Sequence, residues 1–232
     1  DVYKRKELIS ILDELEFRTI KERLERIGLL KQAKDEQLSV FDNDNKTTKV
    51  KVDYKIIDEN KVDRLIKKLR VQKEICFDTE TSSLDIQSAK LAGIAFSCEE
   101  GKAYYVPTLS NTEEILKKLS PLFSDSNILL IGHNLKYDIQ ILSKYGILFH
   151  ENVFDTMLAH YVISPEGSQK LDVLSENYLN HKCIPIEDVI GKKGVNQMSM
   201  IDIPVENVYE YACEDADITL RLKNIFAKEI EK

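Results

Sequence analysis

Two carboxylates lie close together in a short apolar run, the segment Ile75-Cys76-Phe77-Asp78-Thr79-Glu80. Side chains alternate along a strand, so Asp78 and Glu80 would share one face, about 7 Å apart. Two carboxylates on one face of an apolar strand repel each other and resist burial, unless a cation such as Mg²⁺ or Mn²⁺ binds between them. The simpler alternative is that the strand ends here and both acids meet solvent.

A third carboxylate follows the apolar run NILLIG, in the motif GHNLKYD that contains Asn134 and Asp138. Asn134 is predicted to cap a helix whose first turn contains Asp138. Carboxylates near helix N-termini are common because they interact favourably with the helix dipole. By itself, this motif therefore does not require a catalytic role.

A fourth carboxylate, Asp215, lies four residues after Tyr211 in the segment YACEDAD. On a helix the phenol and the carboxylate would share a face, and the apolar residues of this segment use the same face. An acid on that stripe is hard to explain as solvated surface. Glu214 and Asp217 fall elsewhere on the helix, and we expect them to lie at the surface.

The elements that would position these residues alternate between strands and helices. Three β-rich runs with short connections, KEICFDTE, KLAGIAFSC and KAYYVPT, predict antiparallel neighbours. A half-buried strand is predicted before them over 50–56, and after them come a helix over 112–123, the strand NILLIG, a helix over 135–145, a short strand near 153 and a helix over 156–162. A long helix is predicted over 204–232. The fold class is α/β, with a mixed five-stranded sheet covered by helices.

Three segments are expected along the chain. Apolar residues at helical spacing, with a capping box at Thr19 and Glu22, predict a helical hairpin over 1–30. Residues 31–49 are polar and show no sustained period, so they predict a linker. The α/β domain would then span 50–232.

The composition limits the classes of function. The 232 residues carry 33 Lys and Arg and 40 Asp and Glu, and the net charge of −7 gives no sign of the broad basic surface of a duplex-DNA binder. No apolar run approaches the roughly 20 residues of a membrane span. The four cysteines form no CxxC pair, so they encode neither a disulfide framework nor a zinc cluster, and the reducing cytoplasm fits best. The four histidines are not assigned to a metal, because their spacing is not that of metal ligands. They are His133, His150, His160 and His181.

The order of the acids, DxE on a strand, D after a later strand and YxxxD on a C-terminal helix, resembles the three motifs of the DEDD 3′–5′ exonucleases, in the tyrosine (DEDDy) subclass. FDTETSSLD, GHNLKYD, FDTMLAHY and YACEDADITL are similar to the proofreading domain of bacterial DNA polymerase I, of family A, over residues 50–232. DELEFRTIKERL resembles the connector that follows the 5′-nuclease region of such polymerases. The resemblance implies a ribonuclease H-like exonuclease fold with an N-terminal helical hairpin, excised from a longer polymerase.

The resemblance also implies a catalytic set and its cofactors, two Mg²⁺ or Mn²⁺ ions roughly 4 Å apart. Asp78, Glu80 and Asp215 would hold the first ion, and Asp78 and Asp138 the second. Tyr211 would orient the attacking water, because its unperturbed pKa near 10 suits orientation better than base catalysis. The product would be a nucleoside 5′-monophosphate.

The residues implied to bind substrate are Leu84, Asn134, Tyr137 and Met200. Leu84 occupies the place of a leucine that wedges against the terminal base, and Asn134 and Tyr137 match residues lining the same cleft. Met200 stands after an NQ pair, where the family often has an aromatic residue. Aromatic stacking contributes roughly 1 to 3 kcal/mol per base, so we expect weaker binding of the second base.

The partners implied are a single-stranded or frayed DNA 3′ end and a covalently linked polymerase domain, in a monomer without membrane contact. The location implied is the bacterial cytoplasm, at the nucleoid during action on DNA. Two other hypotheses remain open: a DEDDy ribonuclease that trims RNA 3′ ends, and a catalytically idle scaffold domain of a polymerase.

Overall fold

The computed structural model describes residues 8, 11–12, 24, 52–194 and 197–231. The chain divides into two compact units, residues 1–47 and 48–232. The helical hairpin predicted over 1–30 and the linker predicted over 31–49 lie outside the described residues, apart from four isolated positions. In the part of the chain that is described, no helix has both the length and the apolar character needed to cross a membrane.

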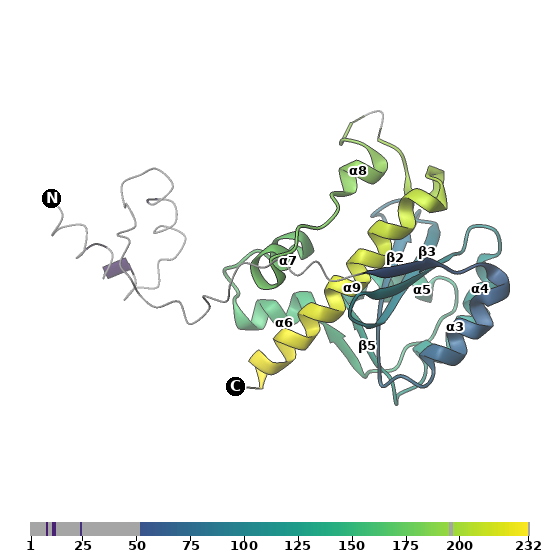
Figure 1. Ribbon diagram of the computed structural model, residues 1–232, viewed down its shortest axis with the longest axis horizontal. Helices are drawn as coiled ribbons and strands as arrows, with labels where there is room; N and C mark the ends of the chain where they lie inside the picture. Colours follow the sequence, from purple (N-terminus) through teal and green to yellow (C-terminus); the bar gives the residue numbers. More distant parts are fainter. Residues whose placement is uncertain (1–7, 9–10, 13–23, 25–51, 195–196, 232) are drawn as a thin grey trace. The chain divides into compact units, whose positions relative to one another are not determined.

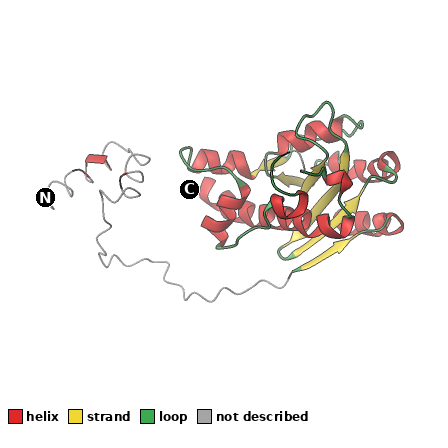
Figure 2. Cartoon of the chain, turned by 90° about the horizontal axis from the view of Figure 1, so that it is seen from above, coloured by secondary structure: helices red, strands yellow, loops and turns green. Residues whose placement is uncertain are grey.

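A six-stranded sheet forms the centre of the second unit (Figures 1 and 2). Its strands are β1 (Asp53–Ile56), β2 (Glu74–Thr81), β3 (Leu91–Glu99), β4 (Lys102–Pro107), β5 (Leu129–Gly132) and β6 (Val153–Asp155). Their spatial order is β1-β4-β3-β2-β5-β6. β2, β3 and β4 pair antiparallel as predicted, whereas β1, β5 and β6 each join a neighbour in parallel. The sheet is therefore mixed.

The prediction of five strands was wrong by one, because β1 also joins the sheet. It pairs with β4, from Asp53 opposite Lys102 to Ile56 opposite Tyr105. This parallel pairing joins residues about fifty positions apart along the chain, and sequence periodicity carries no information about such long-range partners.

Helices cover both faces of the sheet (Figures 1 and 2). The longer helices are α3 (Val62–Leu69), α4 (Thr112–Phe123), α5 (Leu135–Ser143), α6 (Thr156–Ile163), α7 (Leu171–Leu179) and α9 (Val205–Ile230). The shorter ones are η1 (Glu59–Lys61), α8 (Ile186–Ile190) and η2 (Met200–Asp202). The helices predicted over 112–123, 135–145, 156–162 and 204–232 are confirmed within a few residues at their ends. α7 and α8 were not predicted.

Alternation along β2 decides which helix each of its side chains meets. Ile75 and Phe77 belong to the large core cluster that includes side chains of α3, α4 and α5. Cys76 points to the other face, where it clusters with Leu220 of α9. Asp78 and Glu80 follow Cys76 at intervals of two, so the two acids also point towards α9.

The sheet accommodates α9 closely because the facing residues are small. Ala92, Ala95 and Ala103 of β3 and β4 form one cluster with Ala212 and Ala216 of α9. Small side chains on both surfaces allow the helix axis to approach the strands. The acids of β2 and those of α9 are thereby brought within reach of one another.

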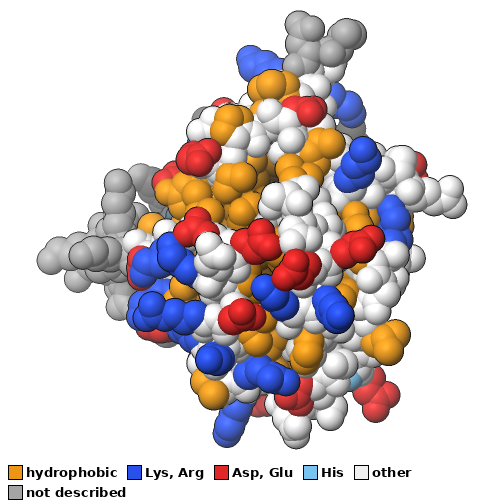
Figure 3. Space-filling model, turned by 90° about the vertical axis from the view of Figure 1, so that its right-hand side faces the viewer, with side chains coloured by type: hydrophobic (Ala, Val, Ile, Leu, Met, Phe, Trp, Pro, Cys, Tyr) orange, Lys and Arg blue, Asp and Glu red, His pale blue; other side chains and the backbone are white. Residues whose placement is uncertain are grey.

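Charges of both signs occur on the face of the molecule shown in Figure 3. Lys and Arg side chains lie among Asp and Glu side chains there, rather than in one uniform basic surface.

Candidate functional site

Three of the four predicted metal-binding carboxylates meet between β2 and α9. One carboxylate oxygen from each of Asp78, Glu80 and Asp215 lies within 4.8 Å of the other two. Glu80 is only 6% exposed, and its Oε1 atom is buried without a hydrogen-bond partner. A buried carboxylate oxygen that lacks a partner is costly, and a bound cation would remove that cost.

The register of the sheet makes room for this cluster. Asp78 lies opposite Ala95 of β3, and Glu80 lies opposite Gly93. At Gly93 an added Cβ atom would fall 2.3 Å from the ring of Tyr105, so a larger residue does not fit there. The neighbouring strand offers only small side chains opposite the two acids, and the ring of Tyr105 from β4 fills the space over Gly93.

Asp138 lies next to the cluster but belongs to a different set of contacts. It is 3% exposed in the first turn of α5, and its Oδ1 atom accepts hydrogen bonds from the backbone N–H and the hydroxyl of Thr79, at 3.0 and 2.5 Å. Thr79 lies between Asp78 and Glu80 on β2. The bond to Thr79 therefore fixes Asp138 beside the strand that carries the other two acids.

Burial and mutual repulsion make these carboxyl groups weak acids. Burial raises the pKa of Asp78 well above its usual value, and the charges of Asp138, Glu80 and Asp215 raise it further. The pKa of Glu80 is raised to about 8 by burial and then by the charges of Asp215 and Asp138. Burial raises the pKa of Asp138 and of Asp215 to about 7. Hydrogen bonds from Thr79 to Asp138 and from Tyr211 to Asp215 lower these pKa values, but by less than burial raises them. Without a metal, several of these groups hold a proton near neutral pH.

These shifts predict that the metal-free protein loses stability as the pH rises. Below about pH 4 the carboxyl groups are protonated in both the folded and the unfolded state, so they contribute no difference. Between about pH 4 and pH 8 the folded protein retains protons that the unfolded chain releases, so the free energy of unfolding falls with rising pH. Urea unfolding in EDTA at several pH values measures this slope.

The control for this experiment is Glu80→Gln, which removes the group with the pKa of about 8 and should flatten the slope at its alkaline end. Adding Mg²⁺ or Mn²⁺ at the alkaline end should restore stability, because a bound cation offsets the repulsion. A wild-type slope that is flat or rises over the whole range would contradict the assignment of buried, repelling carboxyls.

Tyr211 lies one turn before Asp215 on α9 and is half-buried. Its hydroxyl hydrogen-bonds to the Asp215 carboxylate and lowers the pKa of that acid. Burial, and then the nearby charges of Asp215, Glu80 and Asp78, raise the pKa of Tyr211 above its ordinary value. The phenol is therefore neutral, and it acts as a hydrogen-bond donor and acceptor rather than as a base.

Two clefts reach the carboxylate cluster. One, of about 510 Å³, is lined by Asp78, Glu80, Leu84 and Tyr137, among others. Leu84 is 88% exposed. The hydroxyl of Tyr137 donates to the carbonyl oxygen of Ser83 at 2.7 Å, so Tyr137 supports the turn that presents Leu84.

The second cleft, of about 580 Å³, is lined by His133, Asn134 and residues 182–186, and it shares Tyr211, Asp215 and Ile186 with the first. Asn134 and Leu84 therefore line different clefts. Ile186 is 44% exposed and lines both clefts. The sequence does not indicate it as a site residue, because no motif or periodic pattern includes it. Met200 also lines the first cleft. It is only 5% exposed, because it packs in the core cluster that includes Ala212 and Ala216 of α9.

The predicted capping role of Asn134 was wrong. Asn134 adopts a left-handed backbone conformation with φ of 61°, and its side chain makes no capping hydrogen bond. The carboxylate of Asp155 accepts from the backbone N–H groups of Asn134 and Leu135 at 3.2 and 2.8 Å, and also from Met157 at 2.9 Å. Asp155 thus caps α6 and also binds the backbone at the start of α5.

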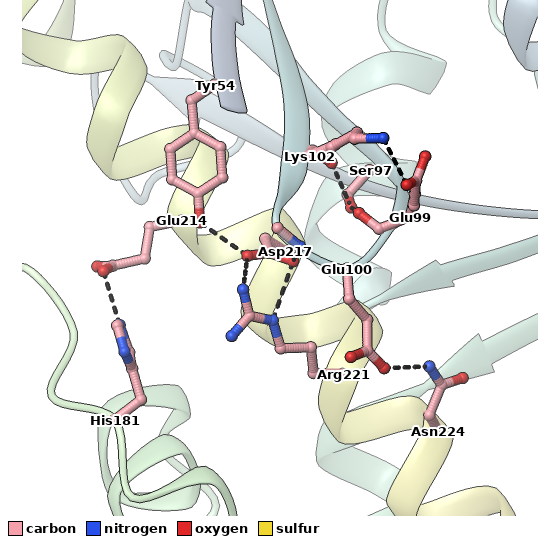
Figure 4. Close-up of polar contacts among 11 residues, drawn as sticks. Tyr54, Ser97, Glu99, Glu100, Lys102, His181, Glu214, Asp217, Arg221 and Asn224 are labelled. Atoms are coloured by element: carbon pink, nitrogen blue, oxygen red, sulfur yellow. Dashed lines mark hydrogen bonds and ion pairs between the residues drawn. The ribbon is translucent and has the colours of Figure 1, made fainter. Parts of the chain in front are cut away.

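The surface positions expected for Glu214 and Asp217 were also wrong, because α9 is covered on more than one side. Asp217 is 0% exposed: it accepts from the hydroxyl of Tyr54 at 2.8 Å and from the backbone N–H of Gly101 at 2.7 Å, and it pairs with Arg221 (Figure 4). Glu214 is 7% exposed and contacts His181 at 2.8 Å. Elements distant in sequence supply all of these partners except Arg221.

Solved structures share the fold of this chain. Escherichia coli RNase D matches with a TM-score of 0.63 and 17% identity, over 78% of this chain and 46% of that one. A structure of Brucella melitensis NrnC with bound Mg²⁺ matches with a TM-score of 0.60 and 19% identity, over 78% of this chain and 83% of that one. At these identities the likeness shows the ribonuclease H-like exonuclease fold.

Sequence relatives identify the family. DNA polymerase I of Pseudomonas aeruginosa is 34% identical over 98% of this chain and 26% of that polymerase, and DNA polymerase I of Borreliella burgdorferi is 38% identical over 91% and 23%. The chain spans about a quarter of the length of these relatives. Residues 54–231 match the family described as 3′–5′ exonuclease. The chain therefore belongs to the 3′–5′ exonuclease family found in DNA polymerase I.

Proposed function

We propose that this chain removes nucleoside 5′-monophosphates from single-stranded or frayed DNA 3′ ends, with divalent metal ions, as the proofreading module of a DNA polymerase I. The observation that carries the proposal is the cluster of Asp78, Glu80 and Asp215, with oxygens within 4.8 Å of one another and the Glu80 Oε1 atom buried without a partner. The cluster adjoins the neutral Tyr211 and a cleft that a chain end can enter.

The residues fit Mg²⁺ or Mn²⁺, because the cluster supplies only carboxylate oxygens. Asp78, Glu80 and Asp215 are assigned to the first ion, and Asp78 and Asp138 to the second. Asp138 retains its Oδ2 atom for this role, because Thr79 occupies Oδ1. When bound, such ions lower the pKa of an attacking water and stabilise the departing 3′-oxygen.

The remaining residues orient the reactants. The neutral hydroxyl of Tyr211, which hydrogen-bonds to Asp215, would orient the attacking water. Leu84 offers an exposed apolar surface to the terminal base, on a turn supported by Tyr137. Met200 would contribute the floor of this cleft, and Asn134 would contact the substrate from the second cleft.

The direct test is digestion of 5′-labelled single-stranded DNA by the purified chain with Mg²⁺. A descending ladder of labelled products is expected, and EDTA should abolish it. The same DNA blocked by a 3′-terminal phosphorothioate should resist the first cleavage, which separates a 3′–5′ exonuclease from a contaminating endonuclease. Intact DNA after incubation with a folded, metal-saturated protein would refute the proposal.

For Tyr211→Phe, a smaller loss is expected than for the metal-binding acids. Removing a positioned hydroxyl should reduce kcat on single-stranded DNA by roughly tenfold to a thousandfold, with little change in KM. Tyr209→Phe is the matched control, because its hydroxyl contacts Glu210 at 3.0 Å, away from the cluster. Equal kinetics of the Tyr211 variant and the control would remove Tyr211 from the mechanism.

Two alternatives use the same fold. RNA 3′-end trimming is favoured by the structural likeness to RNase D, so paired digests of DNA and RNA of one sequence decide between the substrates. A preference for RNA would overturn the choice of DNA. An idle scaffold would need neither metal nor cleavage, so calorimetric titration showing no Mg²⁺ or Mn²⁺ binding would favour that reading.

The proposed context is a single polypeptide in which this domain, residues 50–232, follows a helical connector and a linker and is joined to a polymerase domain. We propose that it acts as a monomer in the bacterial cytoplasm, at the nucleoid. The full-length relatives named DNA polymerase I support this arrangement. Activity of the isolated chain on single strands tests the module apart from its polymerase.

A further inference from the structure

A histidine, a cysteine and a glutamate of α9 form a second group of possible metal ligands, which shares no residue with the cluster of Asp78, Glu80 and Asp215. One ligand atom from each of His181, Cys183 and Glu214 lies within 4.8 Å of the other two. An imidazole nitrogen, a thiolate sulfur and a carboxylate oxygen are the ligands that Zn²⁺ takes in proteins. Mg²⁺ and Mn²⁺ prefer oxygen ligands alone, so this group differs in kind from the cluster of acids.

Hydrogen bonds already hold two of these side chains close to the separation that one metal ion requires. The Nε2 atom of His181 lies 2.8 Å from Oε1 of Glu214 (Figure 4). Two ligand atoms on one tetrahedral Zn²⁺ lie about 3.3 Å apart. Replacing the shared proton by the ion therefore requires the two atoms to move apart by roughly half an ångström. Rotation of the side chains provides this movement.

Two further hydrogen bonds hold the backbone of the segment 181–184 in place. The hydroxyl of Ser175 donates to the carbonyl oxygen of His181 at 2.8 Å, and the backbone N–H of Ile184 donates to Oε2 of Glu214 at 2.6 Å. Ser175 is fully buried in α7. These contacts place His181 and Cys183 against α9 before any metal arrives, which reduces the ordering cost of binding.

The local charge favours a cation. Burial raises the pKa of Cys183 to about 12, and the carboxylates of Glu214, Asp215 and Asp172 contribute to the rise, although contact with the Ser175 side chain lowers the pKa. The neighbouring carboxylates, which contribute to this shift after burial, attract a divalent ion, and the ion then replaces the thiol proton.

The site is open on one side. Cys183 lines the cleft of about 580 Å³ together with Lys170 and Lys182, both of which are exposed and can keep their ammonium groups in water. Three protein ligands leave a fourth tetrahedral position, and a water molecule from the cleft can fill it.

We infer that His181, Cys183 and Glu214 form a Zn²⁺-binding site that fastens the segment 181–184 to α9. On binding, the thiol proton of Cys183 passes to solvent, and the imidazole of His181 carries its proton on Nδ1 so that Nε2 binds the ion. This site does not depend on the proposed exonuclease function. It also revises the expectation that the histidines and cysteines of this chain take no part in metal binding.

Co²⁺ added to the metal-free chain tests the site, because a thiolate ligand gives cobalt a near-ultraviolet charge-transfer band that oxygen ligands do not give. The titration uses Asp78→Asn, in which the acidic cluster is weakened. A thiolate band that saturates at one Co²⁺ per chain and disappears when Zn²⁺ is added is expected. The band should vanish in Cys183→Ser, weaken at least tenfold in apparent affinity in Glu214→Gln, and persist in the matched control Cys98→Ser.

A second measurement needs no variant in the site. Zn²⁺ should protect Cys183 of the wild-type chain from alkylation, as mapped by mass spectrometry, while Cys98 reacts at an unchanged rate. Absence of a thiolate band together with unchanged alkylation of Cys183 would overturn the site. A band that is lost in Cys98→Ser but kept in Cys183→Ser would overturn it equally.

Discussion

Asp78→Asn is expected to lower kcat on single-stranded DNA by at least about a thousandfold, while raising the stability of the metal-free protein. Asp78 is the acid assigned to both ions, and loss of several kcal/mol of transition-state stabilisation corresponds to a rate loss of this size. The stability should rise because the pKa of Asp78 is raised by burial and by three neighbouring carboxylates. The amide keeps the shape of the side chain but removes its charge.

The two opposite effects make this variant informative. A substitution that simply damages the fold lowers both the activity and the melting temperature. Replacing a metal-binding acid by its amide lowers the activity but raises the melting temperature of the metal-free protein. Single-turnover digestion and thermal unfolding in EDTA measure the two quantities. Glu206→Gln removes an exposed carboxylate from the first turn of α9 and should leave turnover nearly unchanged. Near wild-type turnover of Asp78→Asn with saturating Mg²⁺ would be incompatible with the assignment.

Arg221→Ala is expected to destabilise the chain by about 3 to 5 kcal/mol, because it leaves a buried carboxylate without its counter-charge. The side chain of Asp217 is 0% exposed and that of Arg221 is 10% exposed. Arg221 donates from Nε to Asp217 at 3.1 Å and pairs through Nη2 as well. Tyr54 and Gly101 would remain as hydrogen-bond donors to Asp217, but neither carries a positive charge.

Urea unfolding measures this loss, and a second substitution identifies its cause. Adding Asp217→Asn to Arg221→Ala should recover a large part of the lost stability, because the amide is neutral and can still bond to Tyr54. Lys228→Ala, at an exposed position in the last turn of the same helix, should change stability by less than about 0.5 kcal/mol. An Arg221→Ala variant as stable as this control would show that the ion pair contributes nothing.

The same ion pair bears on the site. Asp217 joins α9 to β1 through Tyr54 and to the turn between β3 and β4 through Gly101. Asp215 lies two residues before Asp217 on that helix. Because α9 is anchored in this way, its rotation about its own axis and its position along β2 are fixed. Asp215 is therefore held beside Asp78 and Glu80, as the cluster of oxygens requires.

The sequence by itself determined the class of fold and which residues are proposed to react. Alternation in β2 fixes that Asp78 and Glu80 share a face, and helical spacing fixes that Tyr211 and Asp215 share another. These are local rules, which depend only on backbone geometry over a few residues. The resemblance of four short motifs to one family added the prediction that the four acids form one site.

Only the tertiary structure decided which of these residues meet and what surrounds them. The small residues of β3, β4 and α9, the pairing of β1 with β4, and the coverage of α9 on several sides all join positions far apart in the chain. Glu214 and Asp217 show the limit of local reasoning, because their place on the helix suggested solvent while their partners came from residues 54, 101 and 181. The spacing of apolar residues along a helix indicates one buried stripe. A helix such as α9, which is enclosed by a sheet and by further segments, has more than one buried face.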